Sequence, residues 1–244
     1  MNRFSPGPVT YVLKKNELIA DIVTAGQDTV CIRIPSHPVA NELIRQAGVP
    51  VAAPSANTST RPSATTATDA YQDLHGKVPL ILDSDIALLG IESTILDCTG
   101  DAPRILRYGP LTLEEIEAVV PLTSKQTLST PRTPGSRYKH YAPNVEVVAM
   151  LPATVHNPAF IEEYTLAKEM GLCVRVLSYF YIQSISSSDQ IVYSGEYEFM
   201  NNLFHAFRQA EKQNIDTLYV ILFPEHTLGK GINERIEKAA TRKL

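Results

Sequence analysis

The sequence predicts an α/β fold made of two units joined by a linker. Short β-rich runs alternate with helical patterns from residue 10 to about 120, and the alternation resumes after residue 144. Between them, the segment 121–143 holds four prolines, several Ser and Thr residues and almost no apolar periodicity, which is typical of a linker. We therefore expect a first domain over 1–120, a linker over 121–143 and a C-terminal α/β domain over 144–244.

The first domain opens on a Pro-Gly-Pro turn at residues 6–8 that leads directly into a β-rich run. Strands are expected over the short runs 10–15, 29–35, 49–53, 80–84, 93–97 and 103–109. Helices are expected over 37–48, 64–76 and 112–120. Gly48 is a natural stop for the first helix, and Ser and Thr residues can cap the second. Thr112 can cap the third, where Glu114 and Glu115 suit the helix dipole.

The C-terminal domain repeats the alternation of strands and helices. Strands are expected over 145–151, 173–179, 190–195 and 216–223. Helical patterns lie over 157–171, 197–213 and 231–242. An alternation of this length favours a small α/β unit with a mainly parallel sheet.

The composition excludes several classes of protein. With 22 Lys and Arg against 26 Asp and Glu, the 244-residue chain has a net charge of −4, and 44% of its residues are hydrophobic. These values exclude disorder of the whole chain, and a mildly acidic protein lacks the positive field needed to hold nucleic acid by charge alone. No run reaches the ~18 apolar residues needed to cross a bilayer, and no signal peptide is visible. We therefore expect a soluble cytoplasmic protein that does not contact membranes.

The cysteines and histidines carry no metal-binding or redox motif. Cys31, Cys98 and Cys173 are too far apart for a CxxC site and too few for a disulfide framework. Each lies in an apolar run, which favours an inert buried thiol. The six histidines show no metal-ligand spacing, so we expect no metal site built from side chains alone.

A dense polar cluster follows the apolar run at 49–53. It begins with APSAN at 53–57, and Ser, Thr and Asn remain frequent up to residue 66. After a strand of an α/β sheet, hydroxyl and amide groups can meet phosphate or carboxylate oxygens. The alternative is a polar turn that caps the next helix. The density exceeds what one cap requires, so both interpretations stay open.

A second polar group and three arginines point to a small charged ligand. The run GIEST at 90–94 precedes an apolar strand, and its polar side chains can orient a zwitterion, although a hairpin with an outward Glu is the alternative. Arg33, Arg104 and Arg107 lie in strand patterns, and a guanidinium fits a carboxylate or phosphate bidentately. One such arginine usually lies on a solvated face, whereas three beside polar turns indicate an anionic ligand.

The end of the linker is locally basic and aromatic. With Arg132, the run TPGSRYKHYAPN at 133–144 carries three permanent positive charges and no acid. Its two tyrosines could stack on a base while the cations meet phosphates. The alternative is a linker that docks on the acidic helix 112–120.

In this order, the stretches resemble the two-domain form of the threonylcarbamoyl-AMP synthases. The resemblance rests on PGPVTYVLKK, DTVCIRIPSHP, PSANTSTRPS, GIESTILD, RILRYG, PGSRYKHYAP and, near the C-terminus, INERIEKAA. It implies an incomplete YrdC-like twisted mixed sheet with helices, then the linker, then a small Rossmann-like parallel α/β domain.

The resemblance also implies an activity and its partners. Members make L-threonylcarbamoyladenylate from ATP, L-threonine and bicarbonate or CO2, with Mg²⁺ on the ATP, and release pyrophosphate. The product passes to the tRNA threonylcarbamoyl transferase machinery for the t6A modification of tRNA.

Roles for individual residues follow from the same resemblance. It places Thr29, Ser55, Ser63 and Arg107 on ATP, and Arg33, Ser93 and the backbone of Ala53 on L-threonine. Asn57 joins Ser55 in the catalytic Ser-x-Asn element, and the linker would fold over the nucleotide, with Tyr141 and Asn144 as contacts.

One family element has no counterpart. Members carry a Lys-x-Arg element upstream of the Pro-Gly-Pro turn, and no Lys-x-Arg triplet occurs in the 244 residues. We therefore expect a fragment, a mis-called start or a degenerate member with little activity on its own. One alternative is a module that binds double-stranded RNA or tRNA without catalysis, against which the net charge of −4 speaks. Another is a hydrolase that uses Ser55 or Ser93 with His140, for which no nucleophile elbow is present.

Overall fold

The computed structural model of the chain describes residues 2–84, 87, 89–122, 141–225 and 228–244. Their contacts define two compact units. Unit 1 joins Met1–Pro54 to Glu92–Ser136, and unit 2 joins Ser55–Ile91 to Arg137–Leu244. The basic run up to His140 lies outside the described residues, and the domain boundaries expected at 120 and 143 stay predictions.

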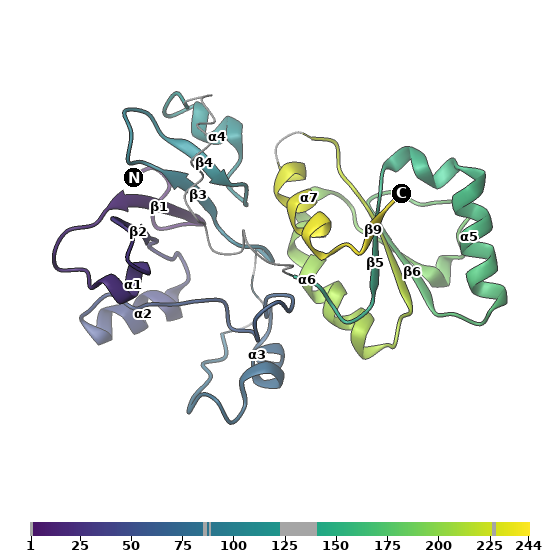
Figure 1. Cartoon of the computed structure of the whole chain (residues 1–244), viewed down its shortest axis with the longest axis horizontal. Coiled ribbons are helices and arrows are strands. Elements are labelled where there is room, and N and C mark those ends of the chain that lie inside the picture. Colours follow the sequence, from purple (N-terminus) through teal and green to yellow (C-terminus); the bar gives the residue numbers. More distant parts are fainter. Residues whose placement is uncertain (1, 85–86, 88, 123–140, 226–227) are drawn as a thin grey trace. The chain divides into compact units, whose positions relative to one another are not determined.

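Unit 1 contains a mixed four-stranded sheet in the order β2-β1-β3-β4 (Figure 1). Its strands are β1 (Val9–Lys14), β2 (Thr29–Ile32), β3 (Thr94–Asp97) and β4 (Arg104–Arg107). The central pair β1 and β3 is parallel, and each pairs with its outer neighbour in the antiparallel sense. Because β1 and β3 start together and β4 runs the opposite way, the beginnings of β1 and β3 lie at the same edge as the end of β4.

Unit 1 has the helices α1 (Asp21–Thr24), α2 (Pro38–Ala47) and α4 (Leu113–Glu117). Both α2 and α4 begin where the sequence signals predict, whereas α4 ends three residues before the expected residue 120. Gly48 ends α2 in the left-handed conformation, at φ 66°. Thr112 caps α4 in a capping box with Glu115, and Ile116 packs against Val9 and Leu96 of the sheet. Ile116 of α4 thereby buries apolar side chains of β1 and β3.

Unit 2 contains a parallel five-stranded sheet in the order β7-β6-β8-β5-β9. Its strands are β5 (Glu146–Met150), β6 (Val174–Ser178), β7 (Gln190–Val192), β8 (Thr217–Ile221) and β9 (Arg242–Lys243). Its helices are α3 (Ala67–Leu74), α5 (Pro158–Glu169), α6 (Glu196–Lys212) and α7 (Leu228–Ala239), with short 3-10 turns at Pro152–His156 and Ser187–Asp189. A mixed sheet in one unit and a parallel sheet in the other confirm the predicted fold class.

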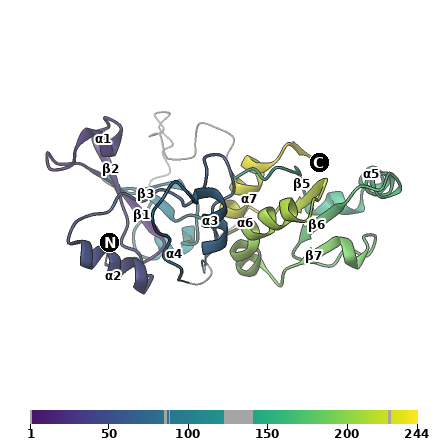
Figure 2. The same cartoon turned by 90° about the horizontal axis from the view of Figure 1, so that it is seen from below.

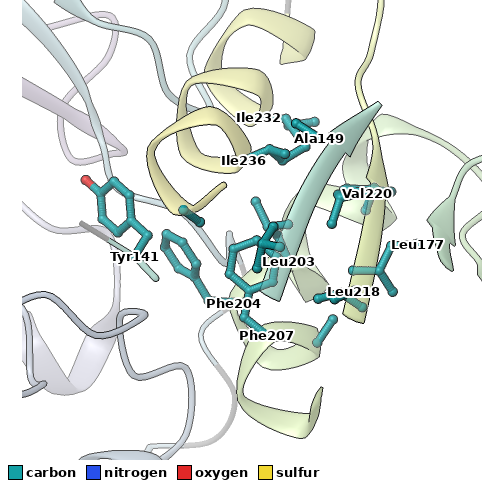
Figure 3. Packing of buried hydrophobic residues seen from close by; sticks show 14 of the residues in the cluster. Tyr141, Ala149, Leu177, Leu203, Phe204, Phe207, Leu218, Val220, Ile232 and Ile236 are labelled. Carbon is teal, nitrogen blue, oxygen red and sulfur yellow. The ribbon is translucent and has the colours of Figure 1, made fainter. Parts of the chain in front are cut away.

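Both faces of the parallel sheet are buried, because its strands carry apolar side chains at successive positions. Along β5, Val147 and Ala149 face the cluster that contains α6 and α7, whereas Val148 and Met150 face the one that contains α5. Figure 1 shows α6 and α7 on one side of this sheet and α5 on the other, and Figure 2 shows α6 along its length. In Figure 3, Phe204 of α6 lies beside Tyr141 within the first cluster.

Two expected strands are wrong. Residues 49–53 and 80–84 have no regular secondary structure, and their larger apolar side chains are exposed, Val49 by 61% and Leu80 by 70%. Apolar content predicts a strand only where a neighbour buries it, and Pro50 removes one backbone donor. The short strand β9 and the helix α1 lack a strong local signal and were not expected.

The expectation that all three thiols are buried is also wrong. Cys31 and Cys173 are exposed, and Cys98 is half-buried. Cys31 lies in β2, which is an edge strand of its sheet, so an apolar run there does not guarantee burial. None of the helices in the described part of the chain combines the length and the apolar composition that crossing a membrane requires.

Candidate active site

A serine, a threonine and an arginine meet at one edge of the unit 1 sheet. Ser93 immediately precedes β3 and is only 5% exposed. Its Oγ lies 2.7 Å from Oγ1 of Thr10 on β1. Arg107, at the end of β4, donates from Nε (3.1 Å) and Nη2 (2.9 Å) to the carbonyl of Ser93, and from Nη2 to its Oγ at 3.3 Å. A hydroxyl and a guanidinium are therefore held side by side, which is the chemistry that orients a carboxylate or phosphate.

Gly109 lets the end of β4 approach this serine. A Cβ at position 109 would lie 2.4 Å from the amide nitrogen of Thr94 and 2.6 Å from the carbonyl oxygen of Glu92. No side chain fits there, so the glycine of RYG is required for the close backbone packing that brings Arg107 onto Ser93.

The other predicted residues of unit 1 lie at the surface or have structural partners. Thr29 begins β2 opposite Lys14, Arg33 is exposed and donates from Nε to the carbonyl of Gly7 at 3.3 Å, and Ala53 is exposed. Arg104 forms an ion pair with Asp97 at 2.8 Å. Burial opposes ionisation of Asp97, but hydrogen bonds from Thr99 and Arg104 outweigh it and hold its pKa below the usual value. Of the three predicted arginines, Arg104 therefore has a structural role, in its ion pair with Asp97.

The Ser-x-Asn segment belongs to unit 2. The amide of Asn57 donates to the carbonyl of Ser55, which forms a tight turn at 3.0 Å. Nδ2 of Asn57 donates to the carbonyls of Thr58 (2.9 Å) and Arg61 (3.2 Å), which fixes which end of the amide is nitrogen. Its Oδ1 is buried and has no hydrogen-bond partner among the described residues. Ser55 is exposed and Ser63 is half-buried in the same segment.

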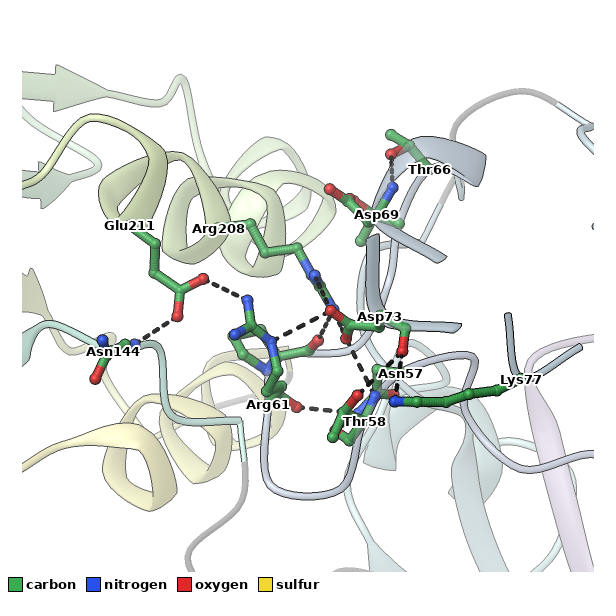
Figure 4. A network of polar contacts seen from close by, with 12 residues as sticks. Asn57, Thr58, Arg61, Thr66, Asp69, Asp73, Lys77, Asn144, Arg208 and Glu211 are labelled. Atoms are coloured by element: carbon green, nitrogen blue, oxygen red, sulfur yellow. Dashed lines mark hydrogen bonds and ion pairs between the residues drawn. The ribbon is translucent and has the colours of Figure 1, made fainter. Parts of the chain in front are cut away.

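An ion-pair network holds the next residues of this segment (Figure 4). Asp73 of α3 accepts from the amide of Thr58 at 3.1 Å and pairs with Arg61 at 3.3 Å. It also pairs with Arg208 of α6 at 2.9 Å, and both side chains are buried. Burial opposes ionisation of Asp73, but the bonds from Arg208 and from the Thr58 amide and the charge of Arg61 prevail, so its pKa lies below the usual value.

The two predicted linker contacts lie in unit 2. Tyr141 is 7% exposed, and its ring stacks on Phe204 with centroids 5.1 Å apart. Its hydroxyl points away from the apolar cluster in Figure 3. Asn144 is exposed, and its backbone amide donates to Oε1 of Glu211 at 2.5 Å. The ring of Tyr141 therefore anchors the chain on α6 rather than offering a whole face to a base.

The predicted site residues divide between the units. Thr29, Arg33, Ala53, Ser93 and Arg107 lie in unit 1, and Ser55, Asn57, Ser63, Tyr141 and Asn144 lie in unit 2. Across the described part of the chain, no three His, Cys, Asp or Glu side chains are grouped so as to hold a metal ion.

Several residues of these arrangements were not predicted from the sequence. They are Thr10, Arg61, Asp73, Arg208 and Glu211. Thr10 and Arg61 lie within stretches that carry the family resemblance, so their position in the sequence could have indicated that they lie near the site. Arg208 follows Phe204 by one helical turn on an apolar face, and a charge in that position needs a buried partner.

Comparisons with known families cover nearly the whole chain. Residues 1–109 match the sequence model of the family described as Telomere recombination. Residues 111–241 match that of Threonylcarbamoyl-AMP synthase, C-terminal domain.

Curated relatives and solved structures match over the same extent. The Threonylcarbamoyl-AMP synthases of Pyrococcus abyssi and Bacillus subtilis are each 36% identical over 98% of this chain, which covers 72% and 71% of them. That of Schizosaccharomyces pombe is 35% identical, and the chain covers 65% of it. The crystal structure of P. abyssi Sua5 complexed with L-threonine superposes with a TM-score of 0.86 at 34% identity, over 100% of this chain and 74% of that one.

Proposed function

This chain belongs to the family of threonylcarbamoyl-AMP synthases, and from that premise we propose that it serves the synthesis of L-threonylcarbamoyladenylate from ATP, L-threonine and bicarbonate or CO2. A similar protein is described in complex with L-threonine, which supports the amino-acid substrate. The product would supply the threonylcarbamoyl transferase machinery that makes t6A in tRNA.

The proposed reaction has two bond-forming steps. The amine of L-threonine takes up CO2 and loses a proton to give a carbamate, or takes up bicarbonate and releases water. A carbamate oxygen then attacks the α-phosphorus of ATP, and the bond from that phosphorus to the bridging oxygen of the β-phosphate breaks, so pyrophosphate leaves. Such a transfer needs positioned donors and cations more than covalent help from the protein.

The arrangement of Arg107, Ser93 and Thr10 carries this proposal. Ser93 is the residue proposed for L-threonine and Arg107 the one proposed for ATP, and their side chains lie 3.3 Å apart. The carbamate forms on L-threonine and then attacks ATP, so the two substrates must lie next to each other. Thr29, Arg33 and the backbone of Ala53 are proposed to complete these contacts from unit 1.

Residues of unit 2 are proposed to hold the nucleotide. The buried Oδ1 of Asn57 is an acceptor without a partner among the described residues, which favours a ligand donor there. Ser55, Ser63, Asn144 and the hydroxyl of Tyr141 are proposed as further contacts. Hydroxyl, amide and guanidinium groups suit phosphate oxygens better than a metal, so Mg²⁺ is proposed to enter on the triphosphate. When bound, it would neutralise charge on the phosphate oxygens.

Ser93→Ala is expected to weaken L-threonine binding by about 10-fold, because a lost hydrogen bond to a charged group costs about 1.5 kcal/mol. Arg107 should stay in place, since two of its bonds go to the backbone carbonyl of residue 93. Calorimetric titration measures the effect. Ser188→Ala removes a hydroxyl that bonds Ser186 on an exposed turn and serves as the control. Equal affinities for wild type and Ser93→Ala would remove Ser93 from the site.

The 244 residues alone are expected to release little pyrophosphate. The sequence has no Lys-x-Arg triplet, and each missing donor of this kind costs about 10²–10³ in rate. Pyrophosphate release is measured with ATP, L-threonine and bicarbonate, and a full-length relative is the positive control. Turnover by this chain at a rate comparable to that relative would refute the expectation.

A further inference from the structure

The segment from Asn57 to Pro62 is attached to helix α6, which belongs to the C-terminal half of the chain. Asp73 binds the Thr58 amide and the Arg61 side chain, and Arg208 of α6 holds Asp73 while also donating to the carbonyl of Pro62 at 2.5 Å. The Arg61 guanidinium pairs a second time with Glu211, one turn further along α6, at 2.6 Å. The segment therefore has several charged or hydrogen-bonded links to α6, two of them through buried groups.

We propose that Arg208 and Glu211 are positioning residues for the Ser-x-Asn element, so that the C-terminal half of the chain sets the geometry of its nucleotide contacts. This inference rests on the proposed function, which places Ser55 and Asn57 on ATP. Arg61 connects Asn57 to Asp73 and to helix α6. Its carbonyl accepts from Nδ2 of Asn57, and its guanidinium is held by Asp73 and Glu211. A shift of Arg61 would therefore move the side-chain amide of Asn57, including its buried Oδ1.

Glu211 also binds the end of the linker, at Asn144. Its Oε2 accepts from Arg61, and its Oε1 accepts from the amide of Asn144 at 2.5 Å. Three and four residues before Glu211 on α6, Arg208 and Phe207 are buried in the core of unit 2, so the helix itself is a rigid support. One carboxylate thus positions two segments to which nucleotide contacts are assigned, the Ser-x-Asn segment and the linker end.

The decisive variant is Glu211→Gln, which keeps the size of the side chain but removes its charge. We expect its affinity for ATP with Mg²⁺ to fall about 10-fold, the effect of losing about one charge-assisted hydrogen bond, while its affinity for L-threonine stays within about twofold. Glu237→Gln removes the exposed pair with Lys243 and is the matched control. Unchanged ATP affinity in Glu211→Gln would overturn the inference, and so would an equal loss of ATP and L-threonine affinity, since that indicates a general loss of structure.

A second measurement does not depend on ligand binding. Arg208→Lys keeps the charge but loses the forked geometry that spans Asp73 and Pro62. Hydrogen exchange of the Thr58 amide, which donates to Asp73, is expected to be about 10-fold faster in this variant, with the amides of β5 and β8 unchanged. Equal exchange at Thr58 would overturn the inference. If the wild type binds neither ATP nor L-threonine, the proposed function fails, and the exchange rates still decide whether α6 positions the segment.

Discussion

Replacing Arg208 by methionine is expected to lower the free energy of unfolding by about 3–5 kcal/mol, because removal of one partner leaves a buried charge uncompensated. The side chain of Arg208 is 1% exposed and that of Asp73 is 5% exposed. Arg61 remains near Asp73 in the variant, but it is 37% exposed and reaches only one oxygen, at 3.3 Å. Urea unfolding at neutral pH measures the loss.

Two further variants make this expectation specific. Asp73→Asn combined with Arg208→Met removes both charges, so the double variant should recover part of the stability that the single variant loses. Lys243→Met breaks an exposed pair in the same unit and should cost less than about 1 kcal/mol. A loss for Arg208→Met no greater than that for Lys243→Met would show that the buried pair does not hold unit 2 together.

Replacing Gly90 by alanine is expected to destabilise unit 2 by about 2–5 kcal/mol, from left-handed backbone strain and overpacking together. Gly90 has φ 59°, and a Cβ there would lie 2.4 Å from the carbonyl oxygens of both Met200 and Asn201. These oxygens belong to the backbone of α6, so they cannot rotate away as a side chain would. The same unfolding measurement in urea applies.

Gly171→Ala separates the two causes. Gly171 has φ 77°, and nothing lies within 4 Å of the Cβ position, so its variant shares the backbone strain and lacks the clash. It should cost about 1–2 kcal/mol. If the two glycine variants lose equal stability, the close approach of residue 90 to α6 contributes nothing. The glycine at position 90 therefore allows close approach of two backbone segments, and the partner is a helix of the protein itself.

Local signals explain which parts of the fold could be predicted. Gly48 and Thr112 mark helix ends by mechanisms that act within a few residues, and both helices are present. The strands β5, β6 and β8 of unit 2 were predicted because burial on both faces leaves continuous apolar runs. The runs 49–53 and 80–84 look the same in the sequence, and only the exposure of their side chains in the structure separates them.

The residues of the candidate site also differ in how far the sequence indicates them. Ser93 and Arg107 lie in a polar run and in a strand pattern that drew attention in the sequence, and the family resemblance assigned their ligands. Thr10 was not singled out, since threonine is an ordinary residue in a strand. The pair of Asp73 and Arg208 spans 135 positions, and no local pattern reports such a contact. The role of α6 in holding the Ser-x-Asn segment is therefore visible only in three dimensions.

The proposed function depends most on recognition of L-threonine by Ser93, at the edge of the unit 1 sheet. Calorimetric titration of the wild-type chain with L-threonine, D-threonine and L-serine, with Mg²⁺ and ATP present and absent, tests it most directly. Saturable binding of L-threonine, weaker binding of L-serine and none of D-threonine is the predicted result. The reason is that the Ser93 hydroxyl, held by Thr10 and Arg107, acts together with the proposed contacts of Arg33 and the Ala53 backbone, and this set reads both the position and the handedness of the ligand. Equal heats for L- and D-threonine, or no binding of L-threonine in either condition, would contradict it.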